Sequence, residues 1–256
     1  MIKLKTPEEI DKLRRGGKIL SSVIDAVEEA MKPGVTTEEL TNLTEELIEK
    51  AGGKPSFKGY KASWTEMVYP SALCVSINEE VVHGLPVPSR TIKEGDVVGI
   101  DCGLEYEGMF TDMARTIIVG DNDNKEVKKL VSITKEALMR GIGQIKPGNH
   151  ISDLSRAIQE HVEDNGFSVV RQLVGHGVGY SAHEEPQIPN FVDKTIKDIE
   201  FKTGMVVAIE PMVNIGDYEV NSEDDGWTIT TKDKSISAHF EHTVVVTEDG
   251  FEIITK

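Results

Sequence analysis

Apolar residues spaced three and four positions apart predict four helices along this chain. The first is expected over roughly 8–31, where one face carries the apolar residues Ile10, Leu13, Leu20, Val23, Val27 and Met31. Pro33 and Gly34 end it, and Thr36 with Glu39 forms a capping box that begins the second helix. The third and fourth helices follow from two further apolar sets: Val127, Leu130, Val131, Thr134, Ala137 and Leu138, then Leu154, Ile158 and Val162.

Short runs rich in Val, Ile and Thr predict strands between and after these helices. The clearest runs are 97–101, 114–119, 206–210 and 242–246. Pro and Gly gather elsewhere, around 84–95 and 186–190, which we interpret as loops.

Two stretches of the chain resemble two later stretches, in the same order. IKEGDVVGID at 92–101 resembles FKTGMVVAIE at 201–210, and each ends in a carboxylate. Upstream, 31–53 and 145–167 both begin with Lys-Pro-Gly after one residue and continue as an apolar helical pattern. A shared order of helix, Lys-Pro-Gly, helix and strand indicates two related halves.

These halves define the expected architecture. We predict an α+β fold in which two pseudo-symmetric helix/strand halves, about 8–120 and 124–254, surround a curved, largely antiparallel sheet. No Ser-rich or low-complexity linker separates the halves, so we expect one domain over 1–256.

Composition narrows the class of protein. The formal net charge of −16 disfavours nucleic acid and acidic membrane surfaces as partners. No apolar run approaches a membrane helix, and the N-terminus lacks the apolar core of a signal peptide, so we expect a cytoplasmic protein. The only cysteines, Cys74 and Cys102, exclude a disulfide framework and a four-cysteine zinc site.

Four carboxylates stand where an apolar strand should continue. Asp101 and Glu210 end strand-like runs, Asp112 lies between two apolar stretches, and Glu241 precedes three valines. A buried charge is costly unless it is paired or bound to metal. If the two halves are related by symmetry, the four side chains meet at the centre of the sheet, where only cations would hold them together.

One histidine suits this set. His176 stands in Gly-His-Gly-Val-Gly, where small neighbours allow backbone and ligand to approach closely; the run lacks the Lys-Ser/Thr of a phosphate loop. His239 and His242 flank Glu241, and we expect a surface or supporting role for them. One imidazole with four carboxylates suits one or two divalent ions such as Mn, Fe, Co or Zn, and two such ions activate water for hydrolysis.

A set of motifs spanning nearly the whole chain closely resembles type I methionine aminopeptidase, which has the pita-bread metallopeptidase fold. The motifs are Ser76-Ile77-Asn78-Glu79-Glu80-Val81-Val82-His83-Gly84, Ile100-Asp101, Thr111-Asp112, Gly175-His176-Gly177-Val178-Gly179, His183-Glu184-Glu185-Pro186-Gln187-Ile188-Pro189, Ala208-Ile209-Glu210-Pro211, Asp225-Gly226-Trp227-Thr228 and Glu241-His242-Thr243.

The resemblance implies a role for each of these site residues. Two divalent metal ions are implied, with the ligands Asp101, Asp112, His176, Glu210 and Glu241, of which Asp112 and Glu241 bridge. Glu210 would also act as general base. His183 would hydrogen-bond the developing oxyanion or the adjacent backbone, and His83 would position the scissile amide.

The resemblance also implies the substrate. The methionine pocket would be lined by Phe57, Tyr60, Tyr69, Cys74 and Trp227. The substrates would be the N-termini of nascent polypeptides with a small second residue, and the protein would be a monomer with transient ribosome contact.

Two departures from the family pattern affect the pocket. The family's compact loop is interrupted here by an insertion at 61–68, which separates Tyr60 from Tyr69, and Ala182 replaces a common aromatic residue. We expect the insertion to reshape the mouth of the pocket. Loss of the aromatic residue would widen the pocket, unless Trp64 or Met67 fills the space.

Two other functions compete with this interpretation. A prolidase or aminopeptidase P-like enzyme of the same fold usually carries a further N-terminal domain, for which 256 residues leave no room. A non-catalytic binding protein on this scaffold would lose metal ligands, whereas this chain retains all five.

Overall fold

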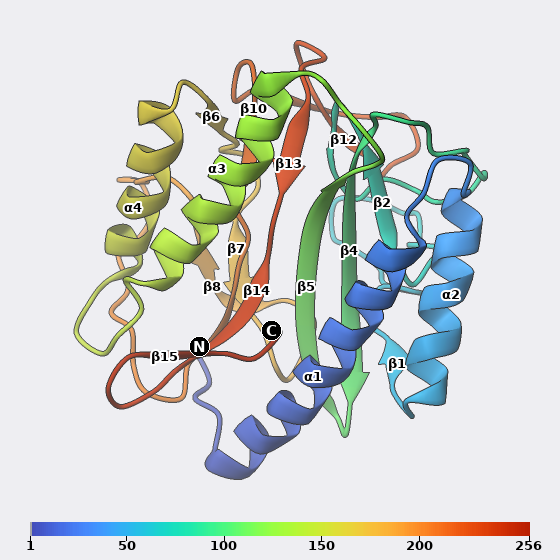
Figure 1. Cartoon of the computed structure of the whole chain (residues 1–256). Coiled ribbons are helices and arrows are strands. Elements are labelled where there is room, and N and C mark those ends of the chain that lie inside the picture. Colours follow the sequence, from blue (N-terminus) through green and yellow to red (C-terminus); the bar gives the residue numbers. More distant parts are fainter. Residues whose placement is uncertain (1) are drawn as a thin grey trace.

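The helices of this protein lie in two pairs, one in each half of the chain. The computed structural model describes residues 2–256, which form α1 (Pro7–Ala30), α2 (Thr37–Lys50), α3 (Lys125–Ile142) and α4 (Ile151–Asp164). The pair α1 and α2 packs beside β4 (Val97–Tyr106) and β5 (Met109–Ile118), and α3 with α4 covers the other side of the same face (Figure 1). All four helices lie where the apolar periods predict them.

The capping box predicted for the second helix is present. The hydroxyl of Thr36 accepts a hydrogen bond from the backbone of Glu39 at 3.2 Å, and the Thr36 backbone donates to the Glu39 carboxylate at 2.8 Å. Thr6 and Glu9 form the same box at the start of α1. Each box satisfies backbone N–H groups that have no partner within the helix.

The strands are numerous and mostly short, and every pair among the described residues is antiparallel. Besides β4 and β5, they are β1 (Lys54–Pro55), β2 (Cys74–Ile77), β3 (Glu80–Val82), β6 (Ser168–Val169), β7 (Gly175–Gly177), β8 (Glu184–Ile188), β9 (Val206–Ile209), β10 (Met212–Asn214), β11 (Val220–Ser222), β12 (Ile229–Thr231), β13 (Ser237–His239), β14 (His242–Val246) and β15 (Phe251–Ile253). The four predicted strand runs fall within or overlap β4, β5, β9 and β14.

The long hairpin of β4 and β5 turns at Glu107 and Gly108. Both residues have positive φ, 51° and 75°, as the tightest class of hairpin turn requires. β4 runs through Tyr106 and β5 begins at Met109, so the turn consists of the two residues between them. The ladder of the two strands pairs Tyr106 with Met109.

The two halves meet where β5 lies beside β14, near the centre of Figure 1. Thr243 bridges them, because its hydroxyl accepts from Asp112 N at 2.9 Å and donates to Asp112 O at 2.8 Å. Glu241 N donates to Ala114 O at 2.9 Å. Among the described residues, the strand ladders form four hydrogen-bonded sheets. The bonds made by Thr243 and Glu241 join the two largest of these sheets into the curved antiparallel layer that the sequence predicts.

Each half has its own apolar core. Leu20 of α1 and Ile100 of β4 belong to the core under the first helix pair. Leu154 of α4 and Val207 of β9 belong to the core under the second pair. Both cores pack helices against the same layer of strands, so the residues at the seam between the halves are held from both sides.

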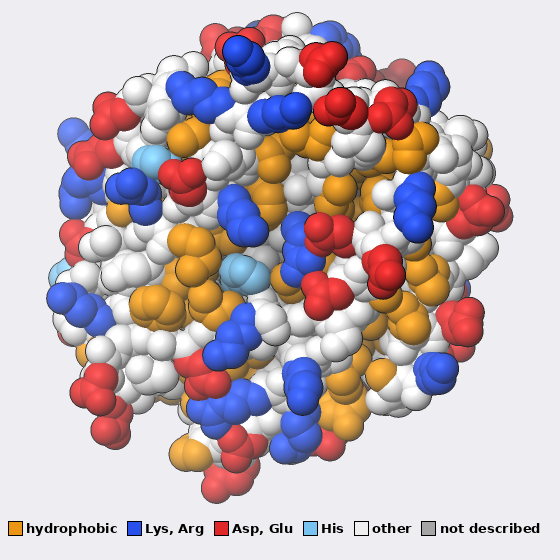
Figure 2. Space-filling view, in the orientation of Figure 1, with side chains coloured by type: hydrophobic (Ala, Val, Ile, Leu, Met, Phe, Trp, Pro, Cys, Tyr) orange, Lys and Arg blue, Asp and Glu red, His pale blue; other side chains and the backbone are white. Residues whose placement is uncertain are grey.

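The outer face carries charges of both signs. Figure 2 shows Lys, Arg, Asp and Glu side chains interspersed over the face that bears the helices. Among residues 2–256, no helix combines the length and the apolar character that crossing a membrane requires.

Candidate metal centre

The four predicted carboxylates converge at the seam between the two halves. Asp101 on β4 pairs with Ala114, and Asp112 on β5 pairs with Gly103, so both aspartates project from the same face of the hairpin. Glu210 directly follows β9, and Glu241 directly precedes β14. Because β9 and β14 pair as antiparallel neighbours, the two glutamates lie side by side.

The oxygen and nitrogen atoms of these side chains fall into overlapping groups. Within each group, one ligand atom per residue lies within 4.8 Å of the others, and the groups are Asp101–Asp112–Glu241, His176–Glu210–Glu241 and Asp112–His176–His183. Asp112, His176 and Glu241 each belong to two groups, so these three side chains link the groups into one cluster.

His176 is held on β7 with one ring nitrogen facing the carboxylates. Its Nδ1 lies 2.9 Å from the carbonyl oxygen of Gly177, and its Nε2 lies 3.4 Å from Glu210 Oε1. The glycines of the motif permit this packing, since a Cβ on Gly175 would lie 2.4 Å from Ala208 O and one on Gly177 would lie 2.2 Å from Glu185 O. A hydrogen bond from Nδ1 to the carbonyl leaves the Nε2 lone pair free for a metal.

The electrostatics of the cluster fit a divalent cation. Burial raises the pKa of Asp101 to about 7 and that of Glu210 to about 8. Burial, followed by the neighbouring carboxylates, raises the pKa values of Asp112 and Glu241 well above their usual range. Asp101 Oδ1 and Glu241 Oε1 are buried without a hydrogen-bond partner. Unpartnered carboxylate oxygens beside an imidazole are a donor set for first-row divalent ions.

Two further histidines face the cluster in their neutral form. His183 lies with its ring 4.3 Å from that of His176 and 5.1 Å from that of Tyr60. Burial lowers the pKa of His183 to about 4, and it lowers the pKa of His83 to about 4 as well. Each ring can therefore donate one hydrogen bond near neutral pH.

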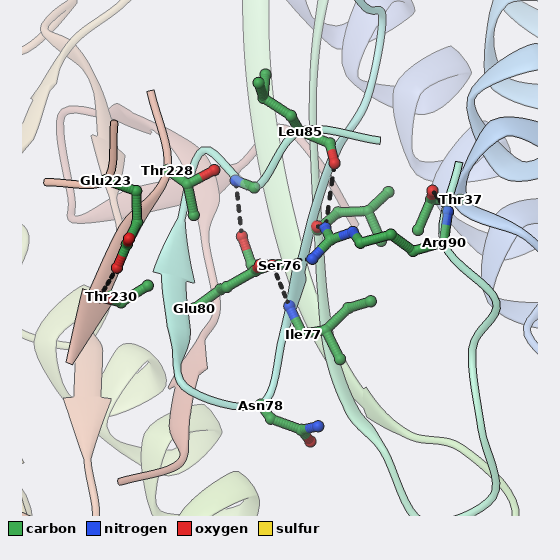
Figure 3. Close-up of polar contacts among 12 residues, drawn as sticks. Thr37, Ser76, Ile77, Asn78, Glu80, Leu85, Arg90, Glu223, Thr228 and Thr230 are labelled. Atoms are coloured by element: carbon green, nitrogen blue, oxygen red, sulfur yellow. Dashed lines mark hydrogen bonds and ion pairs between the residues drawn. The ribbon is translucent and has the colours of Figure 1, made fainter. Parts of the chain in front are cut away.

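The loop that carries His83 is held in an unusual backbone conformation, with φ of 59°. Figure 3 shows the polar contacts that surround it. Glu80 accepts a hydrogen bond from Ile77 N at 2.8 Å and pairs with the guanidinium of Arg90. Strained conformations of this kind persist only where the surroundings fix them.

Arg90 ties together both ends of this loop. Its Nη2 donates to Val75 O at 2.9 Å and to Leu85 O at 3.1 Å (Figure 3). Gly84, directly after His83, packs so closely that a Cβ there would lie 2.4 Å from Val75 O. The sequence singled out Glu80 and Gly84 within a motif, whereas nothing in it pointed to Arg90.

His183 also depends on a contact that the sequence did not reveal. Glu184 accepts hydrogen bonds from the backbone of Tyr180 and Ser181, and its other oxygen lies 2.8 Å from Lys5 Nζ. The Ser181 hydroxyl donates to His183 O at 2.8 Å. The N-terminal segment thereby anchors the turn that presents His183.

An apolar pocket adjoins the cluster. Phe57, Tyr69, Cys74 and Trp227 are buried in one small core, with Tyr60 packed against it, and all five line the same cavity as the carboxylates. Tyr69 and Trp227 meet edge to face with centroids 5.1 Å apart. Burial raises the pKa of the Cys74 thiol well above its usual range, so Cys74 serves as a neutral wall of the pocket.

The insertion separates Tyr60 from Tyr69 along the chain but not in space. Tyr69 N donates to Tyr60 O and Gly59 N to Tyr69 O, each at 2.9 Å, so 61–68 is an excursion whose ends meet. Its Trp64 lines the cavity. Ala182 is buried.

His239 lies closer to the centre than its sequence context indicated. It is buried, and its Nε2 lies 3.6 Å from Glu210 Oε2. His242 instead faces Thr255, with Nδ1 3.2 Å from the hydroxyl. Of the two histidines beside Glu241, only His239 therefore has the supporting position. β13 spans three residues, all of them buried, so it has no alternation that the sequence could show.

Comparison with known proteins identifies relatives of this arrangement. A model of metallopeptidase family M24 matches residues 11–248. The chain is 46% identical to a methionine aminopeptidase of Clostridium perfringens, over 100% of this chain and 99% of the relative. It is 45% identical to methionine aminopeptidase 1 of Bacillus subtilis, over 100% of both.

Solved structures agree with these relatives. The crystal structure of a methionine aminopeptidase from Thermotoga maritima superposes with a TM-score of 0.94 at 46% identity and covers 100% of both chains. A prolidase from Pyrococcus furiosus has a TM-score of 0.74 at 27% identity, with 99% of this chain and 65% of the prolidase covered. These neighbours confirm the predicted pita-bread fold.

Proposed function

The chain belongs to metallopeptidase family M24, and on that premise we propose which residues carry its activity. It is a methionine aminopeptidase, which removes the N-terminal methionine in a metal-dependent hydrolysis. The observation that carries our assignment is the convergence of five side chains from both halves at one seam: Asp101, Asp112, His176, Glu210 and Glu241.

Two divalent ions are the cofactor, and these five side chains would hold them. When bound, the ions supply Lewis acidity for the attack of water on the scissile amide. The chain's own contribution is a rigid donor set, because each carboxylate lies in or beside a paired strand.

The pocket selects the first residue of the substrate. Phe57, Tyr69 and Trp227 form an apolar, aromatic-lined hollow that suits a thioether side chain, since sulfur–aromatic contacts are favourable. The adjoining carboxylates attract the positively charged N-terminal amine. Requiring both features restricts the enzyme to the end of a chain.

Glu210 is positioned to move protons. Its carboxylate lies between His176 and His239, with carboxylate–imidazole distances of 3.4 and 3.6 Å. We assign it the acceptance of a proton from the attacking water and its delivery to the leaving amine.

His83 and His183 are hydrogen-bond donors to the substrate. His183 faces the same space as His176, where it can stabilise charge that develops on the carbonyl oxygen. His83 lines the cavity and the groove next to it, where it can orient the scissile amide.

The experiment is release of methionine from Met-Ala-Ser by protein of measured metal content. Glu210→Gln and His176→Ala should lower kcat by at least a hundredfold with an unchanged circular dichroism spectrum. The matched control is Glu248→Gln, an exposed carboxylate remote from the pocket. Wild-type rates in either site variant, or full activity in a metal-free sample, would refute the assignment.

The finer features of the substrate and cellular setting belong to the same proposal. The substrates are the N-termini of nascent polypeptides whose second residue is small. The enzyme would act on them in the cytoplasm, as a monomer in transient contact with ribosomes. The free state of both cysteines, Cys74 and Cys102, is consistent with a reducing compartment. Ribosome cosedimentation and light scattering test contact and oligomeric state directly.

We also propose that the chain forms one catalytic domain over 1–256, with pseudo-repeats at about 8–120 and 124–254. It is supported by ligands drawn from both halves, because neither half alone would hold the five side chains. Expression of 1–120 by itself should yield a chain that binds no metal at the site.

The prolidase similarity supports one contrasting assay. If the enzyme were a prolidase of the same fold, it would cleave Ala-Pro dipeptides and require no methionine. We expect no release from Ala-Pro under conditions that cleave Met-Ala-Ser.

A further inference from the structure

The inserted segment 61–68 forms a closed flap at the mouth of the cavity. Beyond the bonds that join Tyr60 to Tyr69, Lys61 and Val68 form a bridge at its base. Toward the other wall, the flap packs on the turn that precedes Trp227, because a Cβ on Gly226 would lie 2.9 Å from Met67 Sδ. The flap is therefore fixed at both its base and its side.

The tip of the flap carries Trp64, which points toward the site although 60% of it is exposed. Its ring lies 6.2 Å from that of His83, with the planes 19° apart. It meets Trp227 edge on at 6.0 Å. An exposed indole held between a substrate-facing imidazole and a pocket wall has the position of a binding residue rather than of a core residue.

Trp64 stands where two hollows join. The first is the apolar pocket that we assign to methionine, and the second is a groove whose walls include Gln172, Leu173, Glu185, Gln187 and Met212. Among residues 2–256, five line both hollows: Trp64, His83, His176, His183 and Glu210. The last four surround the place of bond cleavage, and Trp64 is the one bulky apolar side chain among them.

A peptide bound with its first side chain in the pocket must leave through the groove. Its second residue then lies at the junction, against the residues common to both hollows. We propose that Trp64 is a specificity-determining residue whose indole forms the wall facing the second residue of the substrate and restricts that residue to small side chains. This proposal rests on the proposed function of the site.

The test compares peptides that differ only in the second residue. Release of methionine is measured from Met-Ala-Ser, Met-Val-Ser and Met-Leu-Ser for the wild type, Trp64→Ala and Trp64→Phe. In Trp64→Ala, the ratio of kcat/KM for Met-Leu-Ser to that for Met-Ala-Ser should rise at least tenfold. Trp64→Phe retains a ring at the junction and should stay within about threefold of the wild-type ratio.

The matched control is Glu66→Ala, which alters the same flap at a side chain that is 99% exposed and lines neither hollow. Its selectivity ratio should equal that of the wild type. An unchanged ratio in Trp64→Ala, or an equal rise in Glu66→Ala, would overturn the role of Trp64 while leaving the aminopeptidase assignment intact. Failure of the metal-loaded wild type to cleave Met-Ala-Ser would instead overturn the function itself and this inference with it.

Discussion

Lys5 and Glu184 form a buried ion pair that joins the N-terminal segment to the turn presenting His183. The distance between Lys5 Nζ and Glu184 Oε2 is 2.8 Å, and their side chains are only 2% and 12% exposed. The same Glu184 accepts hydrogen bonds from the backbone that leads into His183. The ion pair therefore acts on the site through the position of this turn.

Replacing Lys5 by Met should weaken both folding and catalysis. Removing one partner of a buried pair leaves an uncompensated charge, so we expect the free energy of unfolding to fall by about 3 kcal/mol. A displaced His183 should lower kcat roughly tenfold with little change in KM. Urea unfolding and Met-Ala-Ser kinetics measure the two effects.

Lys18→Met is the control for this prediction, because Lys18 is exposed on α1, the helix that follows Lys5. It should change neither quantity. If Lys5→Met lowers kcat just as far in a His183→Ala background, the ion pair does not act through His183.

Arg90→Met tests whether the strained loop at His83 is held by the contacts in Figure 3. The substitution removes the hydrogen bonds to Val75 O and Leu85 O and the charge beside Glu80. We expect kcat/KM for Met-Ala-Ser to fall roughly tenfold, because a small displacement of a positioned group is costly in rate.

A double-mutant comparison separates positioning from general instability. In a His83→Ala background, Arg90→Met should cause little further loss of kcat/KM, since the group that it positions is already absent. Equal losses in both backgrounds would show that Arg90 serves the fold alone.

The ion pair of Lys5 with Glu184 and the contacts of Arg90 could not be predicted from the sequence. Helix α2 was predictable because Thr36 and Glu39 supply a local start signal and the apolar spacing supplies the face. Asp101 and Glu210 were predictable because a charge that interrupts an apolar strand needs a special environment. Both signals lie within a dozen residues of the feature they predict.

Long-range contacts leave no such local signal. Lys5 and Glu184 are 179 positions apart, and although Glu184 lies within a motif, nothing near either residue in the chain indicates that the two pair. Strands of three residues, such as β13 with His239, are too short to show a period. Trp64 could be located within an insertion, but only packing shows which neighbours its ring meets.

Metal removal should destabilise the enzyme in a pH-dependent manner. In the chelated protein, burial raises the pKa of Asp101 to about 7 and of Glu210 to about 8, while the unfolded chain has ordinary values near 4. The folded state thus binds more protons than the unfolded state between these limits. The stability that these two groups contribute to the chelated protein is present at low pH and is lost as pH rises toward 8.

Thermal unfolding at pH 5.5 and pH 8.0, with chelator or with manganese, checks this dependence. The melting temperature of the chelated protein should be lower at pH 8.0 than at pH 5.5. This decrease should exceed that of the metal-loaded protein by several degrees. In Asp101→Asn the fall should be smaller, because one of the titrating groups is gone. Equal slopes with and without metal would contradict the prediction.

Thr243 should be more important than an ordinary surface threonine, because its hydroxyl joins the two halves at Asp112, which we assign to the metal site. It accepts from Asp112 N and donates to Asp112 O, with distances of 2.9 and 2.8 Å. Thr243→Val keeps the shape but leaves both backbone groups of Asp112 unsatisfied. Buried unsatisfied groups cost about 1–3 kcal/mol each, so we expect the free energy of unfolding to fall by about 2 kcal/mol or more.

Thr243→Val should also weaken the binding of metal by Asp112. Titration of the chelated protein with manganese should give weaker binding in Thr243→Val, whereas Thr203→Val should match the wild type in both assays. Thr203 is exposed, and its hydroxyl donates only to Thr247 O, at 3.4 Å. If Thr243→Val lost stability with unchanged metal affinity, the seam would serve folding only, because Asp112 would then be held in place by β5 without help from the second half.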